Sequence, residues 1–423
     1  MKKMTCQTEL NLCITKIAKQ FGLENVDLAS KPRHTLSKRA TTVQCSLYKG
    51  ENLDVLDSML ETCSSTIDFV YIDPPYNTGQ KFIYLDKRSG LSKGIWGRHH
   101  DWMAFMLPRL VAMKFLLVDS GIIAISIDDY EYAHLKIVLD AVFGPDSYLG
   151  TLVVCRSVNG KGSKLNIAVN HEYVLLFGKS SKATLFGLPE TEEKIYDRED
   201  EFGKYRIDGL FRKKGDASLK EDRPNMHYPL YYADDGKVFT EKGDNLKVTF
   251  PLDSKGVERR WLWGPDKAKV DSWKLHASEK GVVYVKNYQS VNKKTKLRSI
   301  LSNPGYLTDR ATVELKDIFG DKVFETPKPV KLIRDLVDCC APPNATVLDF
   351  FAGSGTTAQA VQELNVRDGT SRKTILIEHN FEIPNDHIAK KNGFHYTSDL
   401  TEARLSFIQR LNPEFNFESV PID

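Results

Sequence analysis

Two features are missing from this 423-residue sequence: a long apolar run and a regular spacing of cysteines. No stretch approaches the ~18 uninterrupted apolar residues that a membrane-spanning helix needs, so we expect no membrane association. The first seven residues lead into polar sequence and lack the apolar segment of a signal peptide. The seven cysteines are odd in number and form no Cys-x-x-Cys pair, which argues against a disulfide framework or a zinc cluster. These absences predict a reducing compartment, the cytoplasm.

Net charge is also small, because 59 basic side chains face 56 acidic ones and leave a balance of +3. The distribution is less even. Residues 151–310 contain 30 basic and 22 acidic side chains, whereas the rest of the chain contains 29 and 34. A basic middle between acidic ends suggests a polyanion partner for the middle, above all nucleic acid, with a solvated surface as the alternative. The 41% hydrophobic and 27% charged content excludes a disordered or collagen-like chain.

Strand and helix periodicities alternate at both ends of the chain. Strands are predicted at 43–48, 67–72, 121–127, 171–177, 345–350 and 374–377. Helices are predicted at 53–60, 102–118, 130–143, 331–339 and 356–364. Such alternation is typical of an α/β doubly wound, mostly parallel sheet.

Between about 180 and 310 the alternation stops. This stretch is polar, turn-rich and aromatic, and it shows no long apolar helix pattern, so we interpret it as an inserted, mainly β or irregular domain. Its tryptophans, Trp261, Trp263 and Trp273, pack a small core or stack on bases, and the core is favoured. The predicted organisation is a helical lead-in over 1–40, a first α/β part over 41–180, an insertion over 181–310 and a second α/β part over 311–423.

A glycine-rich turn follows the predicted strand at 345–350. Gly353 and Gly355 allow a tight turn and a close approach of ligand to backbone, and the next helix presents free N–H groups. The pattern suits a dinucleotide site, with Ala358 in the third glycine position, or an S-adenosylmethionine site. In either scheme Glu378, directly after the next strand, is placed to bind ribose hydroxyls.

A second turn, Asp73-Pro74-Pro75-Tyr76, ends the strand at 67–72, where ligands bind in open α/β sheets. The exocyclic amine of a base is a poor nucleophile, since its lone pair is delocalised into the ring. A carboxylate and a backbone carbonyl that accept its two hydrogens favour a tetrahedral nitrogen able to attack. Asp73 and the Pro74 carbonyl provide these acceptors, Pro75 stiffens the turn, and Tyr76 offers a face for stacking on an unstacked base.

With these two motifs the sequence resembles DNA amino-methyltransferases, most closely the adenine-N6 group and the modification (Mod) subunits of Type III restriction–modification systems. Residues 73–79 match the catalytic block, 48–56 match a block with Glu51 where the family usually has Asp, and 324–330 match the block before the glycine turn. The catalytic turn precedes the cofactor turn, which is the permuted order of the β class. The resemblance covers roughly 45–180 and 310–410, while 181–310 match loosely, as expected of a target-recognition domain.

The resemblance implies a circularly permuted, Rossmann-like S-adenosylmethionine-dependent methyltransferase fold and a site-specific enzyme that methylates N6 of a flipped-out adenine in duplex DNA. The catalytic residues would be Asp73, Pro74, Pro75 and Tyr76. The S-adenosyl-L-methionine site would comprise Asp349, Phe351, Ala352, Gly353, Ser354, Gly355, Thr356, Glu378, Lys328, Pro329 and Glu51. DNA contacts would come from Asn77, Tyr84, Arg259, Arg260, Lys293, Lys294, Lys296 and Arg298, although the run 293–298 also suits a solvated face.

Three alternatives remain open from the sequence. Cytosine-N4 transfer uses the same geometry, but that class more often has Ser at the position of Asp73. An RNA or protein-amide methyltransferase usually places the cofactor turn first. A recognition subunit without activity would not need both motifs intact. Candidate partners are double-stranded DNA, a restriction subunit and a second copy of the chain, and the enzyme belongs to a restriction–modification system or acts as an orphan.

The segment after the catalytic turn, 78–100, is basic and contains glycines, and we interpret it as a loop that orders over the site. His99 and His100 lie in this segment without a neighbouring carboxylate or cysteine cluster, so no metal site is expected.

Overall fold

A computed structural model describes residues 6–23, 26–27, 43–62, 65–79, 83, 95–159, 167–189, 195–289 and 294–422. The chain divides into a larger unit, residues 1–188 and 294–423, and a smaller one, residues 189–293. The smaller unit contains fewer residues than the insertion expected at 181–310. The residues just outside it belong to the larger unit, and Ile300–Leu301 already form a strand of the main sheet.

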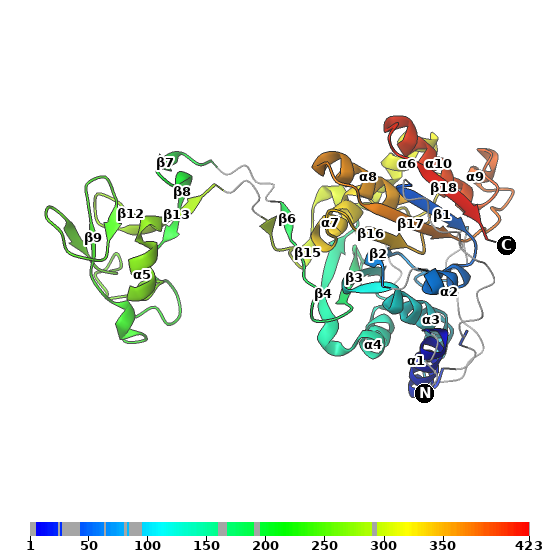
Figure 1. The fold of residues 1–423 in the computed structure, drawn as a ribbon, viewed down its shortest axis with the longest axis horizontal. Coiled ribbons are helices and arrows are strands. Elements are labelled where there is room, and N and C mark those ends of the chain that lie inside the picture. The colour runs from blue at the N-terminus through cyan, green and yellow to red at the C-terminus, as the bar shows by residue number, and fades with distance from the viewer. Residues whose placement is uncertain are drawn as a thin grey trace. The chain divides into compact units, whose positions relative to one another are not determined.

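The larger unit is built on a nine-stranded sheet, in which six of the eight neighbouring pairs run parallel (Figure 1). The strand order across the sheet is β15 (Ile300–Leu301), β4 (Tyr148–Cys155), β5 (His171–Gly178), β3 (Leu117–Ile127), β2 (Ile67–Ile72), β16 (Thr346–Asp349), β17 (Lys373–Glu378), β1 (Cys45–Lys49) and β18 (Phe417–Pro421). β5 is antiparallel to both of its neighbours. The predicted mostly parallel α/β sheet is therefore confirmed.

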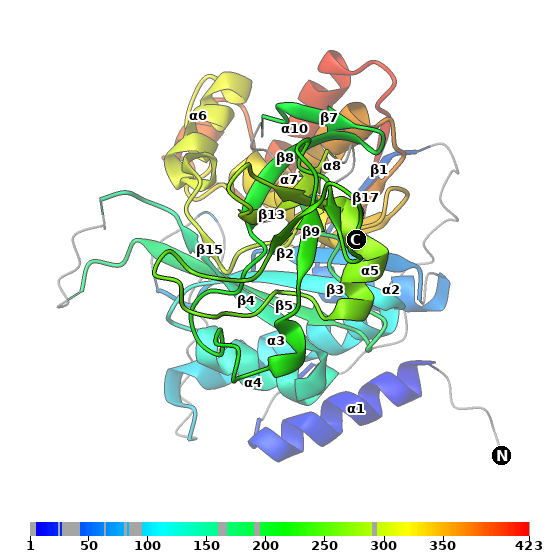
Figure 2. The ribbon, with the colours of Figure 1, turned by 90° about the vertical axis from the view of Figure 1, so that its left-hand side faces the viewer.

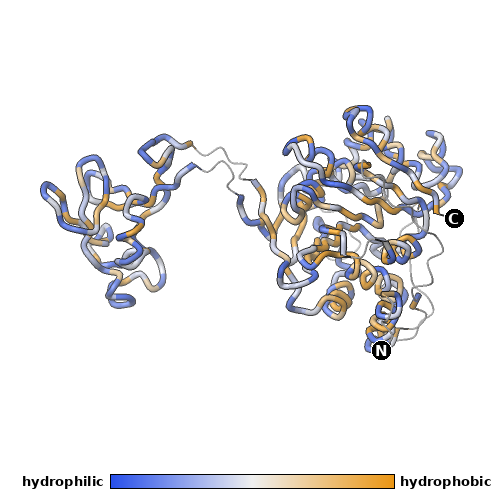
Figure 3. The backbone as a smooth tube through the Cα atoms, viewed as in Figure 1, coloured by the Kyte–Doolittle hydropathy of each residue, from blue (hydrophilic) through white to orange (hydrophobic). Residues whose placement is uncertain are grey.

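Helices cover both faces of this sheet (Figure 2). One face packs against α1 (Cys6–Phe21), α2 (Asn52–Thr62), α3 (His100–Leu116) and α4 (Tyr132–Phe143). The other packs against α7 (Val330–Cys340) and α8 (Thr356–Asp368), with α10 (Thr397–Leu411) beside α8. Buried apolar residues fill both interfaces, so the apolar segments lie inside and the polar ones outside (Figure 3). Two short helices, α6 (Thr308–Phe319) and α9 (Ile388–Lys391), complete the unit.

α3 is apolar on nearly every side because it packs against α1, α2 and α4 as well as the sheet. It ends at Leu116, two residues before the predicted end, since Leu117 already pairs with Ile67 as the first residue of β3. No described helix is both long enough and apolar enough to cross a membrane.

The smaller unit contains short antiparallel strands around its own core, as predicted for the insertion. One sheet has the order β12 (Leu275–Ala277), β13 (Val283–Tyr288), β8 (Gly203–Leu210) and β7 (Arg198–Asp200), and the other β10 (Val238–Phe239), β9 (Leu230–Tyr232) and β11 (Lys247–Thr249). A single short helix, α5 (Pro265–Asp271), is described in it. Trp261 is buried against Phe211 at the centre of this core and Trp263 packs against it, as the core interpretation predicts, whereas Trp273 is 36% exposed and lies outside this cluster. A ribbon of β6 (Leu188–Pro189) and β14 (Lys294–Thr295) lies at its two ends.

The basic surplus of the middle of the chain does not belong to the smaller unit. Residues 189–293 contain 21 basic and 20 acidic side chains, so this unit is close to neutral. The surplus comes from the flanking stretches 151–188 and 294–310, which together contain nine basic and two acidic side chains. The expectation of a basic insertion is corrected accordingly: the excess positive charge is carried by segments of the larger unit.

Candidate active site

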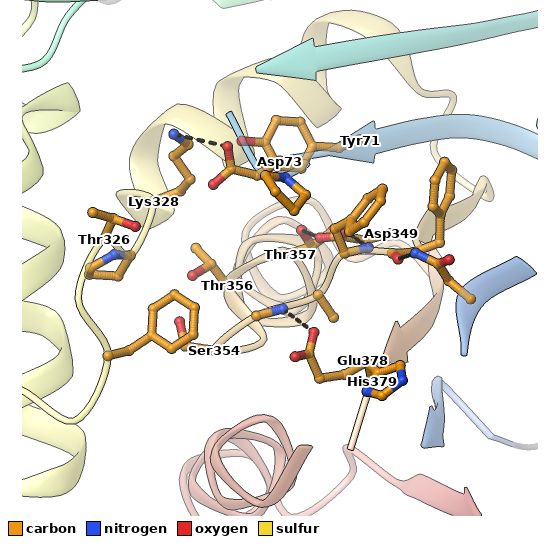
Figure 4. Close-up of a pocket in the computed structure, with 18 of the residues that line it drawn as sticks. Tyr71, Asp73, Thr326, Lys328, Asp349, Ser354, Thr356, Thr357, Glu378 and His379 are labelled. Atoms are coloured by element: carbon orange, nitrogen blue, oxygen red, sulfur yellow. Dashed lines mark hydrogen bonds and ion pairs between the residues drawn. The ribbon is translucent and has the colours of Figure 1, made fainter. Parts of the chain in front are cut away.

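The two sequence motifs meet because the strands that carry them are neighbours. β2 and β16 pair in parallel, with Phe69 opposite Val347 and Val70 opposite Leu348. Their carboxyl ends therefore lie side by side, and the turn at Asp73 faces the glycine turn (Figure 4). A cavity with about 850 Å³ of empty space, its open mouth included, lies between them. It is lined by Glu51, Asn52, Tyr71, Asp73, Pro75, Phe105, Phe324, Thr326, Pro327, Lys328, Asp349, Phe350, Phe351, Ala352, Gly353, Ser354, Thr356, Thr357, Glu378, His379 and Phe381.

The glycine turn needs both of its glycines. Gly353 and Gly355 have φ values of 53° and 80°, in the left-handed region that L side chains rarely adopt. A Cβ at Gly353 would lie 3.2 Å from the Phe324 ring, and one at Gly355 would lie 3.2 Å from Cγ2 of Thr401. Thr401 also donates to the Gly353 carbonyl at 2.6 Å, which ties the turn to α10.

Two buried carboxyl groups, those of Asp349 and Glu378, hold the glycine turn by hydrogen bonds. Oε2 of Glu378 accepts a hydrogen bond from the Gly353 N–H at 2.7 Å, and Asp349 accepts from the Thr357 hydroxyl and the Phe351 N–H. Burial raises the pKa of Asp349 to about 7 and that of Glu378 to about 8. Asp349 and Glu378 form no ion pair with a cation of the described residues, which favours a ligand that brings positive charge and hydrogen-bond donors.

Glu51 lies at the wall of the cavity and forms an ion pair with the buried Arg109. Burial alone would raise the pKa of Glu51, but Arg109 outweighs this and the pKa is lowered. Arg109 also donates to Asn52 at 2.6 Å, and Asn52 in turn donates to the Phe350 carbonyl at 2.9 Å. The start of α2 is thereby fixed against the strand that leads into the glycine turn.

Aromatic side chains form the apolar part of the wall. The Phe105 and Phe351 rings lie 6.1 Å apart at a tilt of 55°, and Phe324 and Phe381 also line the cavity. Flat apolar surface of this kind suits a planar ring such as a purine.

On the side of the catalytic turn, Lys328 connects three groups. Its ammonium nitrogen lies 3.1 Å from Oδ1 of Asp73, 2.7 Å from the Tyr76 hydroxyl and 3.0 Å from Oε2 of Glu172. The Tyr76 hydroxyl donates to the same Oδ1 of Asp73 at 2.7 Å.

Protonation in this group follows from burial and charge. Burial raises the pKa of Asp73, and Glu172 adds to the effect while Lys328 opposes it. Burial alone would lower the pKa of Lys328, but Asp73 and Glu172 outweigh it and the pKa is raised. The lysine is therefore a fixed cation between two carboxyl groups.

The backbone of the catalytic turn is held by groups outside the cavity. The Trp102 indole N–H donates to the Pro75 carbonyl at 2.7 Å. Asn77 has a φ of 60°, and its buried side chain donates to Oε1 of Glu131 at 2.6 Å and to the Arg98 carbonyl at 3.2 Å. Asn77, expected among the DNA contacts, is thus placed as an internal support of the turn.

Other expected DNA contacts are scattered. Arg260 is buried and donates to the Ala217 carbonyl at 2.6 Å, while Arg259 pairs with Asp253 at 2.9 Å. Both therefore make hydrogen bonds inside the smaller unit. The exposed residues are Lys294, Lys296 and Arg298, all in the larger unit. Tyr84, Lys293 and most of the expected loop at 78–100 lie outside the described residues.

Of the expected cofactor residues, Asp349, Phe351, Ala352, Gly353, Ser354, Thr356, Glu378, Lys328 and Glu51 line the cavity. Gly355 shapes the turn from behind, and Pro329 caps the start of α7. Sequence patterns did not single out Glu172, Arg109 or Trp102 as site residues. Glu172 lies on β5 and both Arg109 and Trp102 lie on α3, so they reach the site from elements outside the two turn motifs.

A second group of aromatic residues lies on the smaller unit. Phe202, Trp273 and Tyr288 form a cluster, with the Phe202 and Trp273 rings 4.3 Å apart and the Trp273 and Tyr288 rings 5.4 Å apart. Phe202 is 52% exposed and Trp273 is 36% exposed. Lys274 lies 4.8 Å above the Trp273 ring. Exposed aromatic rings beside a lysine provide the contacts that nucleic acids accept.

Comparison with known proteins agrees with this geometry. The sequence matches the DNA methylase family over residues 67–391. It is 51% identical to the Type II methyltransferase M.KpnI of Klebsiella pneumoniae, over 97% of this chain and 98% of that protein. It is 32% identical to the Type III EcoPI Mod subunit of Escherichia phage P1 and 33% identical to the StyLTI Mod subunit of Salmonella typhimurium. Those alignments cover 89% and 84% of this chain but 64% and 56% of the Mod subunits.

Proposed function

Because this chain belongs to the DNA methylase family, we propose that it transfers a methyl group from S-adenosylmethionine to the exocyclic N6 of adenine in duplex DNA. The observation that carries the proposal is the convergence of the Asp73 turn and the glycine turn on one cavity. The flipped base enters from the side of Asp73, since an adenine inside the helix cannot reach the site.

The residues present fit S-adenosylmethionine, which supplies an electrophilic methyl group on a positively charged sulfur. The buried carboxyl groups of Asp349 and Glu378 compensate the positive charge of the cofactor and accept hydrogen bonds from its hydroxyl groups. Gly353 lets the backbone approach closely, and the rings of Phe105 and Phe351 provide an apolar wall for the adenine part. Glu51 is fixed by Arg109 and lies at the cavity wall, where its carboxylate can accept a hydrogen bond from a hydroxyl group of the cofactor.

Asp73 orients the target amine. Tyr76 and Lys328 both contact Oδ1 of Asp73, so Oδ2 is the oxygen that we assign to an amino hydrogen of the base. The Pro74 carbonyl accepts the second hydrogen, and the nitrogen lone pair is then directed at the methyl group. Formation of the nitrogen–carbon bond would break the sulfur–methyl bond of the cofactor, which would leave as a neutral thioether. The nitrogen would lose one proton, and the raised pKa of Asp73 suits this carboxylate as the acceptor.

Lys328 has two roles in this proposal. Its positive charge compensates Asp73 and Glu172 and opposes the rise in the pKa of Asp73 that burial causes, which favours the ionised form that accepts hydrogen bonds. It also holds the Tyr76 hydroxyl, so that the Tyr76 ring has a fixed orientation for stacking on the base. The lysine thus serves the base side of the cavity as well as the cofactor block in which the resemblance places it.

DNA is held by two surfaces in this proposal. The cluster of Phe202, Trp273, Tyr288 and Lys274 on the smaller unit contacts bases or sugars, and Lys296 and Arg298 of the larger unit contact phosphates. In this proposal the larger unit supplies most of the charge-dependent affinity for DNA, and the smaller unit supplies most of the contacts that recognise the DNA sequence. Arg259 and Arg260 support the fold of the smaller unit.

We further propose that the enzyme methylates DNA on its own, as the methyltransferase of a restriction–modification system in the cytoplasm of a bacterium. The alignment over 98% of a Type II methyltransferase supports this, whereas the Mod subunits extend well beyond the aligned region. Methylation by the purified chain alone tests it; activity that requires an added restriction subunit would contradict it. Gel filtration of the active protein distinguishes a monomer from a homodimer.

The test of the catalytic proposal is the variant Asp73→Ala. It is expected to bind the cofactor and to transfer no methyl group to DNA. Retained transfer by a folded Asp73→Ala protein would overturn the role of this carboxylate.

A further inference from the structure

Three potential metal ligands meet next to the catalytic turn, outside the cavity. His99 ends the short helix Gly97–His99, Glu131 directly precedes α4, and His134 lies one turn further along α4. Nδ1 of His99 lies 2.8 Å from Oε1 of Glu131, and Nδ1 of His134 lies 3.3 Å from Oε2. One potential ligand atom from each of the three residues lies within 4.8 Å of those of the other two.

The two histidine–glutamate separations, 2.8 Å and 3.3 Å, are close to those within a coordination sphere. With metal–ligand bonds of roughly 2.0–2.2 Å, neighbouring donor atoms around one ion lie roughly 3.0–3.5 Å apart. Two imidazoles and a carboxylate form a donor set that Zn²⁺ and its neighbours in the first transition row accept. Three protein ligands also leave a position for water.

A second observation concerns the state of these groups without an ion. The Glu131 side chain is 1% exposed, yet its Oε2 makes no hydrogen bond within the described structure, and neither does the buried Nδ1 of His134. A buried carboxylate oxygen and an imidazole nitrogen that face each other without a hydrogen bond are an arrangement that an ion between them would satisfy.

We propose that His99, Glu131 and His134 bind one divalent transition-metal ion, with Zn²⁺ as the best match to the donor set. The ion joins the short helix at His99 to the start of α4. Glu131 also accepts the hydrogen bond of Asn77, the residue that follows Tyr76, so the ion fixes the support of the catalytic turn. Its role is structural, and it takes no part in methyl transfer.

Binding through Nδ1 requires small local changes. The two imidazole rings are stacked 3.8 Å apart and turn slightly to point both nitrogens at the ion. Nε2 of His99 then carries the proton, so the exposed Arg98 side chain, now 3.4 Å from that atom, must move away. The sequence expectation of no metal site considered only His99 and His100. It missed the ligands because Glu131 and His134 join His99 only in the folded chain.

The test uses the untagged, full-length protein after removal of metal with a chelator. Zn²⁺ alone is titrated in by calorimetry, and Co²⁺ is added separately so that its visible spectrum reports nitrogen and oxygen ligands. We expect one equivalent to bind. His134→Asn and His99→Asn are each expected to weaken binding about ten-fold or more and to change the Co²⁺ spectrum.

His387→Asn is the matched control, because His387 also faces a carboxylate, Glu325 at 3.1 Å, but belongs to no three-ligand group among the described residues. It is expected to bind Zn²⁺ like the unchanged protein. Circular dichroism and thermal unfolding of the metal-free variants establish that each is folded. Absence of binding to the unchanged protein, or equal binding by all three folded variants, would overturn the proposal.

Discussion

The ammonium nitrogen of Lys328 lies 3.1 Å from Oδ1 of Asp73, although the two residues belong to opposite parts of the sequence. The contact joins the block before the glycine turn to the catalytic turn, so the cofactor side and the base side of the cavity share one charged group. Glu172, from the antiparallel strand β5, completes the link at 3.0 Å from the same nitrogen. Several expectations about activity follow from this relationship.

Replacing Lys328 by Met removes the cation that opposes the high pKa of Asp73. The pKa of Asp73 then rises further, and the carboxylate becomes ionised only at higher pH. We expect a lower kcat at neutral pH and an acid limb of the pH–rate profile displaced to higher pH, with partial recovery as pH rises. The profile of kcat against pH for methyl transfer is the measurement.

Lys331→Met is the matched control for this prediction. Lys331 lies one position into α7 and pairs with Asp335 at 2.8 Å, away from Asp73. Its pH profile is expected to follow that of the unchanged enzyme. A purely structural role of Lys328 would lower activity equally at every pH and leave the limb in place.

Gly353→Ala is expected to weaken cofactor binding. The added Cβ would lie 3.2 Å from the Phe324 ring and would stand at a φ of 53°, a strain of roughly 1 kcal/mol before any clash. Either the turn or Phe324 must shift at the wall of the cavity. Calorimetric titration with S-adenosylmethionine should show a loss of affinity of about ten-fold or more.

Gly369→Ala is the control that separates the effect of backbone strain from an effect on the cofactor site. Gly369 has a similar φ of 63° at the end of α8, but a Cβ there would meet nothing within 4 Å. It should carry the same backbone strain of roughly 1 kcal/mol and leave the affinity for the cofactor unchanged. Equal loss of affinity in both variants would contradict the assignment of the glycine turn to the cofactor.

Cofactor affinity should depend on pH through Glu378 and Asp349. In the folded protein the pKa of Glu378 is raised to about 8 and that of Asp349 to about 7. The contribution of these two groups to the stability of the free protein is therefore greatest at a pH below their unfolded-state pKa values, and it is lost as the pH rises through 7 and 8. A cationic ligand prefers the ionised carboxylates. We therefore expect affinity to rise between pH 6 and pH 8, with release of protons on binding.

Calorimetry in two buffers of different ionisation enthalpy measures this proton release. Glu378→Gln removes one of the two groups and should reduce both the release and the slope of affinity with pH. An affinity independent of pH over this range would contradict the role given to the buried carboxyl groups.

Trp273→Ala should weaken DNA binding without affecting the cofactor. Stacking of a base on an aromatic side chain contributes about 1–3 kcal/mol, which corresponds to a loss of about 5–150-fold if Trp273 makes such a contact. Phe239→Ala, at a side chain of the same unit that is 40% exposed, serves as the control. Fluorescence anisotropy with labelled duplex DNA gives both affinities; similar values for the two variants would exclude this cluster from the DNA interface.

The sequence predicts most of the sheet because six of its nine strands contain short, mainly apolar runs with clear ends. The strand 67–72 is recovered to the residue, since Pro74 and Pro75 stop it. β4, β15 and β18 were not predicted. β18 has only partly buried residues, and it exists because β1 offers it an open edge, which no local pattern reveals.

Site residues were predictable where the chemistry lies within one short motif, as in Asp73–Tyr76 and the glycine turn. Groups that act across the fold were not. Glu172 reaches Lys328 only because β5 runs antiparallel beside β3, and Glu131 reaches Asn77 and His99 only when α4 is in place. The charge count misled for a related reason, since charges that are adjacent in sequence to the insertion belong to the larger unit.

The most direct test of the central claim is the identity of the methylated nucleoside. Unmethylated duplex DNA is incubated with the purified chain and S-adenosylmethionine that carries a labelled methyl group, and the DNA is then digested to nucleosides and separated. The account predicts label in N6-methyladenine alone, and none with Asp73→Ala. Label in N4-methylcytosine, or equal label from the Asp73→Ala protein, would contradict it.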